Sequence, residues 1–248
     1  MITQQNSRTA MLLGEEAVEK LASARVAIFG VGGVGGYVAE ALARAGVGAI
    51  DLIDNDTVSL SNLNRQIIAL HSTVGRLKVE VMAERIRDIN PDCRVRALPL
   101  FYLPESASAF DFTSYDYIAD AIDTVSAKLD LAVRAYEANT PIIAAMGAGN
   151  KLDASAFEVA DNAKTSVCPL ARVMRIELRK RGINHMKVVY SKEEPHTPQG
   201  EQIPDAAGRR ATPGSVSFVP GAAGHFFPSS SRQAEGQRNE RHHAKHFS

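Results

Sequence analysis

A glycine-rich turn is the first feature of the sequence that could do chemistry. It follows the apolar run 26–29 with the spacing G-x-G-G-x-G, and its glycines are Gly30, Gly32, Gly33 and Gly35. Glycines at this spacing let backbone N–H groups approach phosphate oxygens at the start of a helix. The motif alone is weak, because glycines also serve strand–helix packing. Asp54 strengthens it, since a carboxylate at the end of the next strand would accept hydrogen bonds from ribose hydroxyls. The sequence therefore predicts an adenine-nucleotide site.

A set of cationic and amide side chains follows the turn within one crossover, and its members are Asn62, Arg65, Gln66 and Lys78. A dinucleotide carries only a diphosphate, whereas a triphosphate needs cations that neutralise the charge moving to its leaving group. Asp123, which closes the run 120–123, could hold Mg²⁺ through one or two oxygens. The set favours an ATP-using enzyme over an NAD-dependent dehydrogenase, which would be indifferent to loss of Arg65. A nucleotide-sensing scaffold without catalysis is a third hypothesis.

Alternating strands and helices must position these side chains. Strands are expected at 26–29, 50–54, 95–100, 115–122, 141–145, 156–159 and 186–190. Helices are expected at 9–22, 37–44, 73–90, 126–139 and 169–181. Short apolar strands that alternate with helices are typical of parallel sheets covered on both faces. The rhythm predicts a doubly wound α/β fold with a mainly parallel sheet.

Composition limits the remaining choices. The 248 residues include 28 Lys+Arg and 28 Asp+Glu, so the formal charge is zero. This balance excludes a globally basic nucleic-acid coat, and we expect no DNA partner. The two cysteines, Cys93 and Cys168, are too few for a disulfide framework or a four-cysteine zinc site. Because the sequence shows neither a signal segment nor an apolar run of about 18 residues, we expect a cytoplasmic protein.

Together, these motifs resemble the adenylating core shared by ThiF, MoeB and ubiquitin-activating enzymes. The resemblance rests on the glycine turn, Asp54, the run 62–66, Lys78 and the run 120–123. Other segments look most like the tRNA threonylcarbamoyladenosine dehydratases of that superfamily, and they are 46–54, 78–86, 164–165, 169–171 and 215–220. The resemblance covers residues 9–224 and implies the Rossmann-like adenylating fold.

The resemblance implies a dehydration of threonylcarbamoyladenosine next to the tRNA anticodon. The carboxylate of the modified base would attack the α-phosphate of ATP, and pyrophosphate would leave. The carbamoyl nitrogen would then close on the activated carbonyl and release AMP, so that the base loses water overall. In such a reaction the protein supplies positioning and charge stabilisation.

The resemblance also assigns residue roles, position by position. Arg65 would reach the outer phosphates, Lys78 would contact them and Asp123 would coordinate Mg²⁺, so these are the expected catalytic residues. The remaining ATP-binding residues would be the ribose-binding Asp54, the two amides beside the arginine and the four glycines, namely Asn62, Gln66, Gly30, Gly32, Gly33 and Gly35. The resemblance implies a homodimer and leaves open a bound monovalent cation and a sulfur-relay protein partner.

An adenylyltransferase that activates the C-terminus of a ubiquitin-like sulfur-carrier protein is the nearest alternative. It would share every ATP-binding residue named above, but its zinc-ribbon members carry paired Cys-x-x-Cys, which this sequence lacks. Members that load a thiol need a placed cysteine. Cys168, before Pro169, could be that thiol or a structural residue at the start of a helix.

Side chains in the second half of the chain allow two interpretations. Arg172, Arg175 and Arg179 would share a helix face, which is either a contact along tRNA phosphates or an ordinary solvated face. Lys128 could face the nucleotide, although a lysine on a helix surface is the expected arrangement. The polar loop 191–214 is either a lid over the modified base or a surface loop.

We expect one adenylating domain over residues 1–224. It would comprise the N-terminal helix 9–22, a nucleotide core at 25–150 and a substrate-side half at 151–224. The Ser-, Arg- and His-rich segment 225–248 predicts a disordered tail. Members of the family continue there as an apolar helix, so this tail indicates an altered or frame-shifted C-terminus.

Overall fold

The computed structural model describes residues 4–197, and its centre is a seven-stranded sheet in the order β3-β2-β1-β4-β5-β7-β6. All neighbouring strands are parallel except β6 and β7, which are antiparallel. The strands are β1 (Arg25–Phe29), β2 (Ala49–Ile53), β3 (Arg94–Leu98), β4 (Tyr117–Asp120), β5 (Ile142–Ala145), β6 (Phe157–Asp161) and β7 (Lys187–Ser191). The predicted doubly wound, mainly parallel sheet is confirmed. The predicted disordered tail lies outside the described residues.

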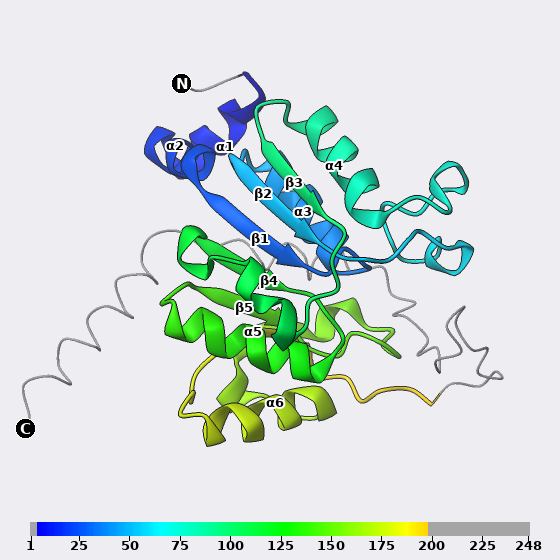
Figure 1. Cartoon of the computed structure of the whole chain (residues 1–248), viewed down its shortest axis with the longest axis vertical. Coiled ribbons are helices and arrows are strands. Elements are labelled where there is room, and N and C mark those ends of the chain that lie inside the picture. Colours follow the sequence, from blue (N-terminus) through cyan, green and yellow to red (C-terminus); the bar gives the residue numbers. More distant parts are fainter. Residues whose placement is uncertain (1–3, 198–248) are drawn as a thin grey trace, which may run out of the picture.

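Helices cover both faces of this sheet (Figure 1). The helices are α1 (Ser7–Leu13), α2 (Glu15–Ser23), α3 (Gly35–Arg44), α4 (Lys78–Ile89), α5 (Val125–Glu137) and α6 (Pro169–Lys180). One apolar cluster joins α3 and α4 to the sheet, while α5 and α6 pack through two clusters that use the alternate side chains of the same strands. Within residues 4–197, no helix combines the length and the apolar character needed to cross a bilayer.

Two of the predicted helices are placed wrongly. The expected single helix 9–22 is divided by Gly14, whose φ of +85° is left-handed backbone that interrupts a helix. The expected helix 73–90 begins only at Lys78, because Gly75 has a φ of +88° and Leu77 forms an isolated bridge with Thr57. The other observed ends of the helices and strands differ by at most two residues from the predicted ends. The later start makes Lys78 the first residue of α4.

The order of the strands brings two loops together at one edge of the sheet. From β1 the chain proceeds outward through β2 to β3, and then it returns to β4 on the other side of β1 and proceeds outward again. In open α/β sheets, ligands bind in the crevice at the carboxyl ends of the strands where this order reverses. The glycine turn follows β1 and the run 121–124 follows β4, so both lie at this switch point.

Candidate functional site

Two of the four glycines are required by the fold itself. Gly30 has a φ of +88°, and a Cβ atom added to it would lie 2.5 Å from the carbonyl oxygen of Ala121. A Cβ atom on Gly35 would lie 1.8 Å from the carbonyl oxygen of Gly30. A side chain at either position would push the turn away from β4 or from α3. These glycines let the turn, the helix and the end of β4 approach one another.

The other two glycines, Gly32 and Gly33, lie beside the side chains of Gln66 and Arg65. Nothing approaches an added Cβ atom on Gly32 more closely than Gln66 Nε2, at 3.7 Å, and Arg65 Cγ lies 3.6 Å from one on Gly33. These are ordinary contact distances, so packing does not require glycine here. Gly32 and Gly33 therefore lie beside Arg65 and Gln66, just before the start of α3 at Gly35.

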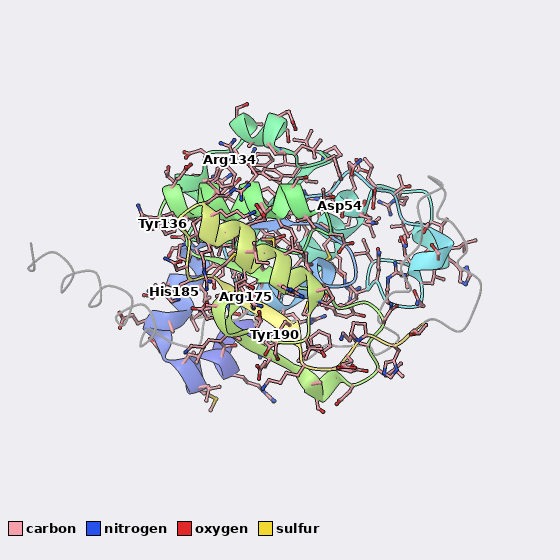
Figure 2. The ribbon with its side chains drawn as sticks, turned by 90° about the horizontal axis from the view of Figure 1, so that it is seen from below. Asp54, Arg134, Tyr136, Arg175, His185 and Tyr190 are labelled. Atoms are coloured by element: carbon pink, nitrogen blue, oxygen red, sulfur yellow. The ribbon has the colours of Figure 1, made fainter. Side chains whose placement is uncertain are left out.

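Asp54 lies one residue beyond β2 and is labelled in Figure 2. Its Oδ2 accepts a 2.7 Å hydrogen bond from the N–H of Val31, and its Oδ1 accepts a 2.8 Å bond from the N–H of Asp56. The carboxylate thus ties the glycine turn to the loop after β2. A carboxylate has about four lone-pair positions, so these bonds leave acceptor capacity for a ligand. The predicted ribose contact stays a prediction, and the tie to the turn is a role that the sequence pattern did not indicate.

Gln66 has an orphaned polar atom. The side chain is 7% exposed, and its Oε1 has no hydrogen-bond partner among the described residues. Leaving such an atom unpaired in the interior costs about 1–3 kcal/mol, so nearly all are satisfied by a partner. The amide oxygen of Asn62, by contrast, has a partner, because Asn62 Oδ1 accepts a hydrogen bond of 3.1 Å from the N–H of Ser59. Gln66 therefore indicates a place for a ligand group that donates a hydrogen bond.

Arg65 is partly engaged by its own loop. Its Nη1 donates to the carbonyl oxygen of Ser61 and to Oδ1 of Asn64, both at 2.9 Å. Within residues 4–197, its Nε and Nη2 have no hydrogen-bond partner. The loop therefore fixes one edge of the guanidinium group and leaves donors on the other. Such a fork can bind two phosphate oxygens at once.

Lys78 is held by a counter-ion that the sequence pattern did not reveal. Its side chain is 7% exposed, and Nζ lies 2.7 Å from Oδ2 of Asp56, whose side chain is 52% exposed. Any anion that Lys78 contacts must compete with this carboxylate. The signal was present in the sequence, because Asp56 follows Asp54 by two residues in the loop that ends β2.

Asp123 is exposed and has no hydrogen bond or ion pair with any described residue. It lies in the turn between β4 and α5 rather than at the end of a strand, because β4 ends at Asp120. No cluster of three or more metal-ligating side chains occurs among residues 4–197. A cation here would therefore have fewer than three protein ligands of this kind and would need oxygens from a ligand, which is a usual arrangement for Mg²⁺ with phosphates.

Lys128 is not on the surface, and the expectation of an exposed helix lysine is wrong. Lys128 and Asp120 are both 0% exposed, and Nζ lies 2.9 Å from both carboxylate oxygens, with hydrogen-bond geometry only to Oδ1. Burial raises the pKa of the Asp120 carboxyl above its ordinary value, and the nearby Lys128 opposes that shift. The expectation failed because Lys128 is the fourth residue of α5, where a side chain points back toward the sheet edge.

The arginine stripe on α6 is broken in the structure. Nη1 of Arg175 (Figure 2) donates to the carbonyl oxygen of Thr165 at 2.9 Å and to its Oγ1 at 2.7 Å, so this side chain closes the turn before α6. Arg172 and Arg179 are exposed. Cys168 is buried at the start of α6, as expected of a structural cysteine. Arg175 thus differs from Arg172 and Arg179 in being engaged by its own turn through Nη1, and the contact of this helix face with tRNA phosphates stays a prediction.

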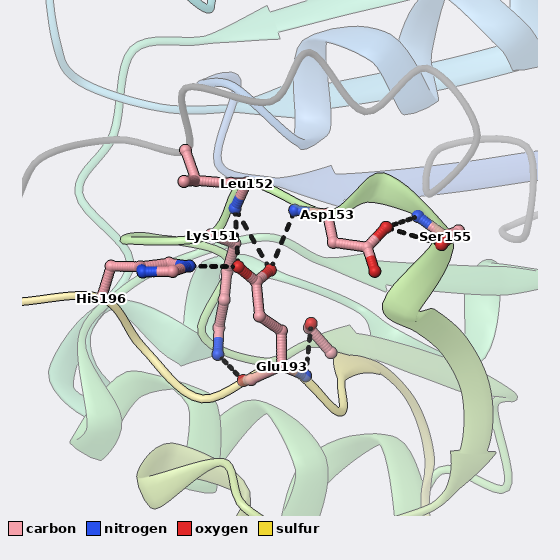
Figure 3. A network of polar contacts seen from close by, with 7 residues as sticks. Lys151, Leu152, Asp153, Ser155, Glu193 and His196 are labelled. Atoms are coloured by element: carbon pink, nitrogen blue, oxygen red, sulfur yellow. Dashed lines mark hydrogen bonds and ion pairs between the residues drawn. The ribbon is translucent and has the colours of Figure 1, made fainter.

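A polar network joins the loop after β5 to the segment after β7 (Figure 3). The carboxylate of Glu193 accepts hydrogen bonds from the N–H groups of Leu152 and Asp153, and these bonds lower its pKa below the ordinary value, that of Leu152 first. Lys151 donates to the carbonyl oxygen of Glu193, and His196 Nε2 lies 2.7 Å from Oε1 of Glu193. The start of the predicted loop or lid 191–214 is thereby tied to the loop after β5, and its part beyond residue 197 lies outside the described residues.

Comparisons with known proteins find one family along most of the chain. The model of the ThiF family matches residues 6–198. The tRNA threonylcarbamoyladenosine dehydratase of Bacillus subtilis is 43% identical over 228 residues, which are 89% of this chain and 90% of that protein. The crystal structure of the E. coli tRNA N6-threonylcarbamoyladenosine dehydratase in complex with ATP is similar, with a TM-score of 0.80, 36% identity and coverage of 96% of each chain. A shorter match to an adenylyltransferase and sulfurtransferase of Vanderwaltozyma polyspora, at 37% identity, covers 56% of this chain and 31% of that protein.

Proposed function

This chain belongs to the ThiF family, and on that premise we propose that it catalyses the ATP-dependent dehydration of threonylcarbamoyladenosine in tRNA. Similarity to a dehydratase along 90% of that relative, and to an ATP-bound dehydratase structure along 96% of the chain, supports this function. The observation that carries it is the buried Oε1 of Gln66, which has no described partner although the Gln66 side chain lies beside Gly32 of the glycine turn.

The side chains around the turn fit a nucleoside triphosphate. We propose that Gly32 and Gly33 leave room for phosphate oxygens at the N-terminus of α3, where the helix dipole favours an anion. Arg65 offers free N–H donors beside them, and Lys78 supplies a second positive charge once it leaves Asp56. The orphaned acceptor of Gln66 would bind a hydroxyl or N–H group of the nucleotide.

Asp123 is the residue that we propose to hold Mg²⁺ together with the phosphates of ATP. Its carboxylate is exposed and engaged with no described residue, and Mg²⁺ commonly uses one or two carboxylates plus substrate phosphates. When bound, the ion would neutralise negative charge on the departing pyrophosphate.

In the proposed reaction the protein positions two reactants and stabilises charge. The carboxylate oxygen of the modified base forms a bond to the α-phosphorus, and the bond from that phosphorus to the bridging oxygen of pyrophosphate breaks. Arg65 and Lys78 stabilise the charge that gathers on the leaving group. The carbamoyl nitrogen then attacks the acyl carbon, loses its proton, and AMP leaves as a good leaving group. No side chain has to become covalently attached.

The sulfur-carrier hypothesis is supported less well. The match to the adenylyltransferase and sulfurtransferase of Vanderwaltozyma polyspora covers only 31% of that protein, and Cys168 is buried rather than presented as an acceptor thiol.

Five further expectations stay predictions. They are the single domain over 1–224, the homodimer, the cytoplasmic location, the sulfur-relay partner and the monovalent cation.

Pyrophosphate release from Mg-ATP tests the function. We expect release with tRNA that carries threonylcarbamoyladenosine, and none with unmodified tRNA or without RNA. The product tRNA should be lighter by one water, which mass spectrometry of the nucleosides would detect. Release driven instead by a sulfur-carrier peptide ending in Gly-Gly would contradict the dehydratase function and support the adenylyltransferase.

Alanine at Gly32 should weaken ATP binding, whereas alanine at Gly35 should lower the stability of the fold. Gly32→Ala should fold, since its methyl group would meet no atom closer than 3.7 Å, but should weaken ATP binding about tenfold by filling the space in front of the turn. Gly35→Ala should lose more than about 4 kcal/mol of stability, because its Cβ atom would lie 1.8 Å from a carbonyl oxygen. Urea unfolding and calorimetry of ATP binding separate the two effects. Unchanged ATP affinity in Gly32→Ala would show that the turn does not face the nucleotide.

A further inference from the structure

The turn between β4 and α5 is closed by a buried ion pair that the proposed reaction does not use. Lys128 Nζ donates to Asp120 Oδ1 at 2.9 Å and to the carbonyl oxygen of Ile122 at 3.0 Å. The N–H of Ile122 donates in turn to Asp120 Oδ1 at 3.2 Å. These three hydrogen bonds hold both the N–H group and the carbonyl oxygen of Ile122. They form a closed ring within the segment 120–128.

Stability alone is a poor explanation for this pair. Both side chains are completely buried, and taking two charges out of water costs about as much as their attraction returns. A positive charge in the first turn of a helix also opposes the helix dipole. Apolar side chains would fill the same space at less cost, but they could not hold the carbonyl oxygen of Ile122. The ion pair therefore selects one conformation of the turn.

That conformation of the turn positions both the glycine turn at Gly30 and the Asp123 carboxylate. A Cβ atom on Gly30 would lie 2.5 Å from the carbonyl oxygen of Ala121 and 3.1 Å from the nitrogen of Ile122. The glycine turn therefore packs directly against the Ala121–Ile122 peptide. Asp123 is the next residue, and its exposed side chain leaves from the same fixed backbone. Because Lys128 pairs with Asp120, only the Asp123 carboxylate at this edge is exposed and free of a described partner.

We propose that Lys128 is a positioning residue, which holds the Ile122–Asp123 peptide so that the Asp123 carboxylate meets the Mg²⁺ bound with ATP. This inference rests on the proposed function. Lys128 touches neither the metal nor the nucleotide, and it acts through Asp123. Residues that orient a metal ligand in this way typically contribute about 10- to 100-fold to metal affinity.

The test measures the affinity for Mg²⁺ rather than turnover. A non-hydrolysable ATP analogue is titrated into the full-length protein by calorimetry at increasing Mg²⁺ concentrations, without RNA. Lys128→Met should raise the Mg²⁺ concentration for half-maximal enhancement of binding about tenfold. Its affinity for the analogue in EDTA should stay within about twofold, because the phosphate-binding side chains are elsewhere. Lys20→Met, at an exposed lysine of α2, is the matched control and should change neither value.

A double variant separates positioning from stability. Lys128→Met alone leaves Asp120 buried without its counter-ion and should lower the Tm. Lys128→Met combined with Asp120→Asn removes both charges and should recover most of that Tm while keeping the weakened response to Mg²⁺. A recovered Tm with an unchanged Mg²⁺ response would overturn the positioning role and leave the proposed function standing. Absence of any Mg²⁺-enhanced binding in the unsubstituted protein would overturn the positioning role and the proposed Mg²⁺ site together, whereas the dehydratase function is decided by the pyrophosphate assay.

Discussion

Replacing Arg65 with alanine should slow pyrophosphate release by about 10³-fold and leave the fold intact. The arginine is only partly buried, its stem lies against Gly33, and one nitrogen is tethered to Ser61 and Asn64. Its Nε and Nη2 have no partner among the described residues and are the donors that we propose to bind the phosphates of ATP. Removing them withdraws stabilisation that the leaving pyrophosphate needs most in the transition state. Single-turnover pyrophosphate release, with the modified tRNA and saturating Mg-ATP, measures the effect.

Two controls define what this loss means. Arg87→Ala removes an exposed arginine from α4 and should leave the rate within about twofold of that of the unsubstituted protein. Arg65→Lys keeps the charge but not the planar fork, so it should recover only part of the rate. A wild-type rate in Arg65→Ala would remove the arginine from the site. If the protein also bound a nicotinamide dinucleotide, the dehydrogenase hypothesis would replace the adenylating one.

Asp123→Asn should reduce the rate about 10²-fold and shift its dependence on Mg²⁺. The amide keeps the shape of the side chain but replaces a charged metal ligand by a neutral one. Because Asp123 is exposed and engaged with no described residue, the Tm should change little. Rates measured across a series of Mg²⁺ concentrations should rise toward the wild-type rate at the highest ones.

The matched control for this variant is Asp92→Asn, which changes an exposed carboxylate in the turn between α4 and β3. It should alter neither the rate nor the response to Mg²⁺. An Asp123→Asn protein whose Mg²⁺ response equals that of Asp92→Asn would contradict the proposed metal site. The proposed dehydration could still stand in that case, since Arg65 and Lys78 act on the phosphates independently.

Much of the fold follows from local signals in the sequence. Apolar runs such as 26–29 and 142–145 form buried strands because helices cover both faces of a parallel sheet. The helix ends after Arg44 and before Pro91 were predicted well, whereas the break at Gly14 was missed. The start of α4 was predicted wrongly, because the bridge between Thr57 and Leu77 joins residues far apart in the chain. No periodicity within 73–90 reports such a contact.

The sequence by itself determined the class of the sheet, the glycine turn and the set of side chains around it, because these depend on residue type and short-range spacing. The tertiary structure alone decided which of those side chains are free. It placed β4 beside β1, so that the Ala121–Ile122 peptide, just before Asp123, lies against Gly30. It also buried Lys128 against Asp120 and engaged Arg175 with Thr165. The partner of a charged side chain is set by the packing of distant segments, and its own neighbours in the sequence do not encode it.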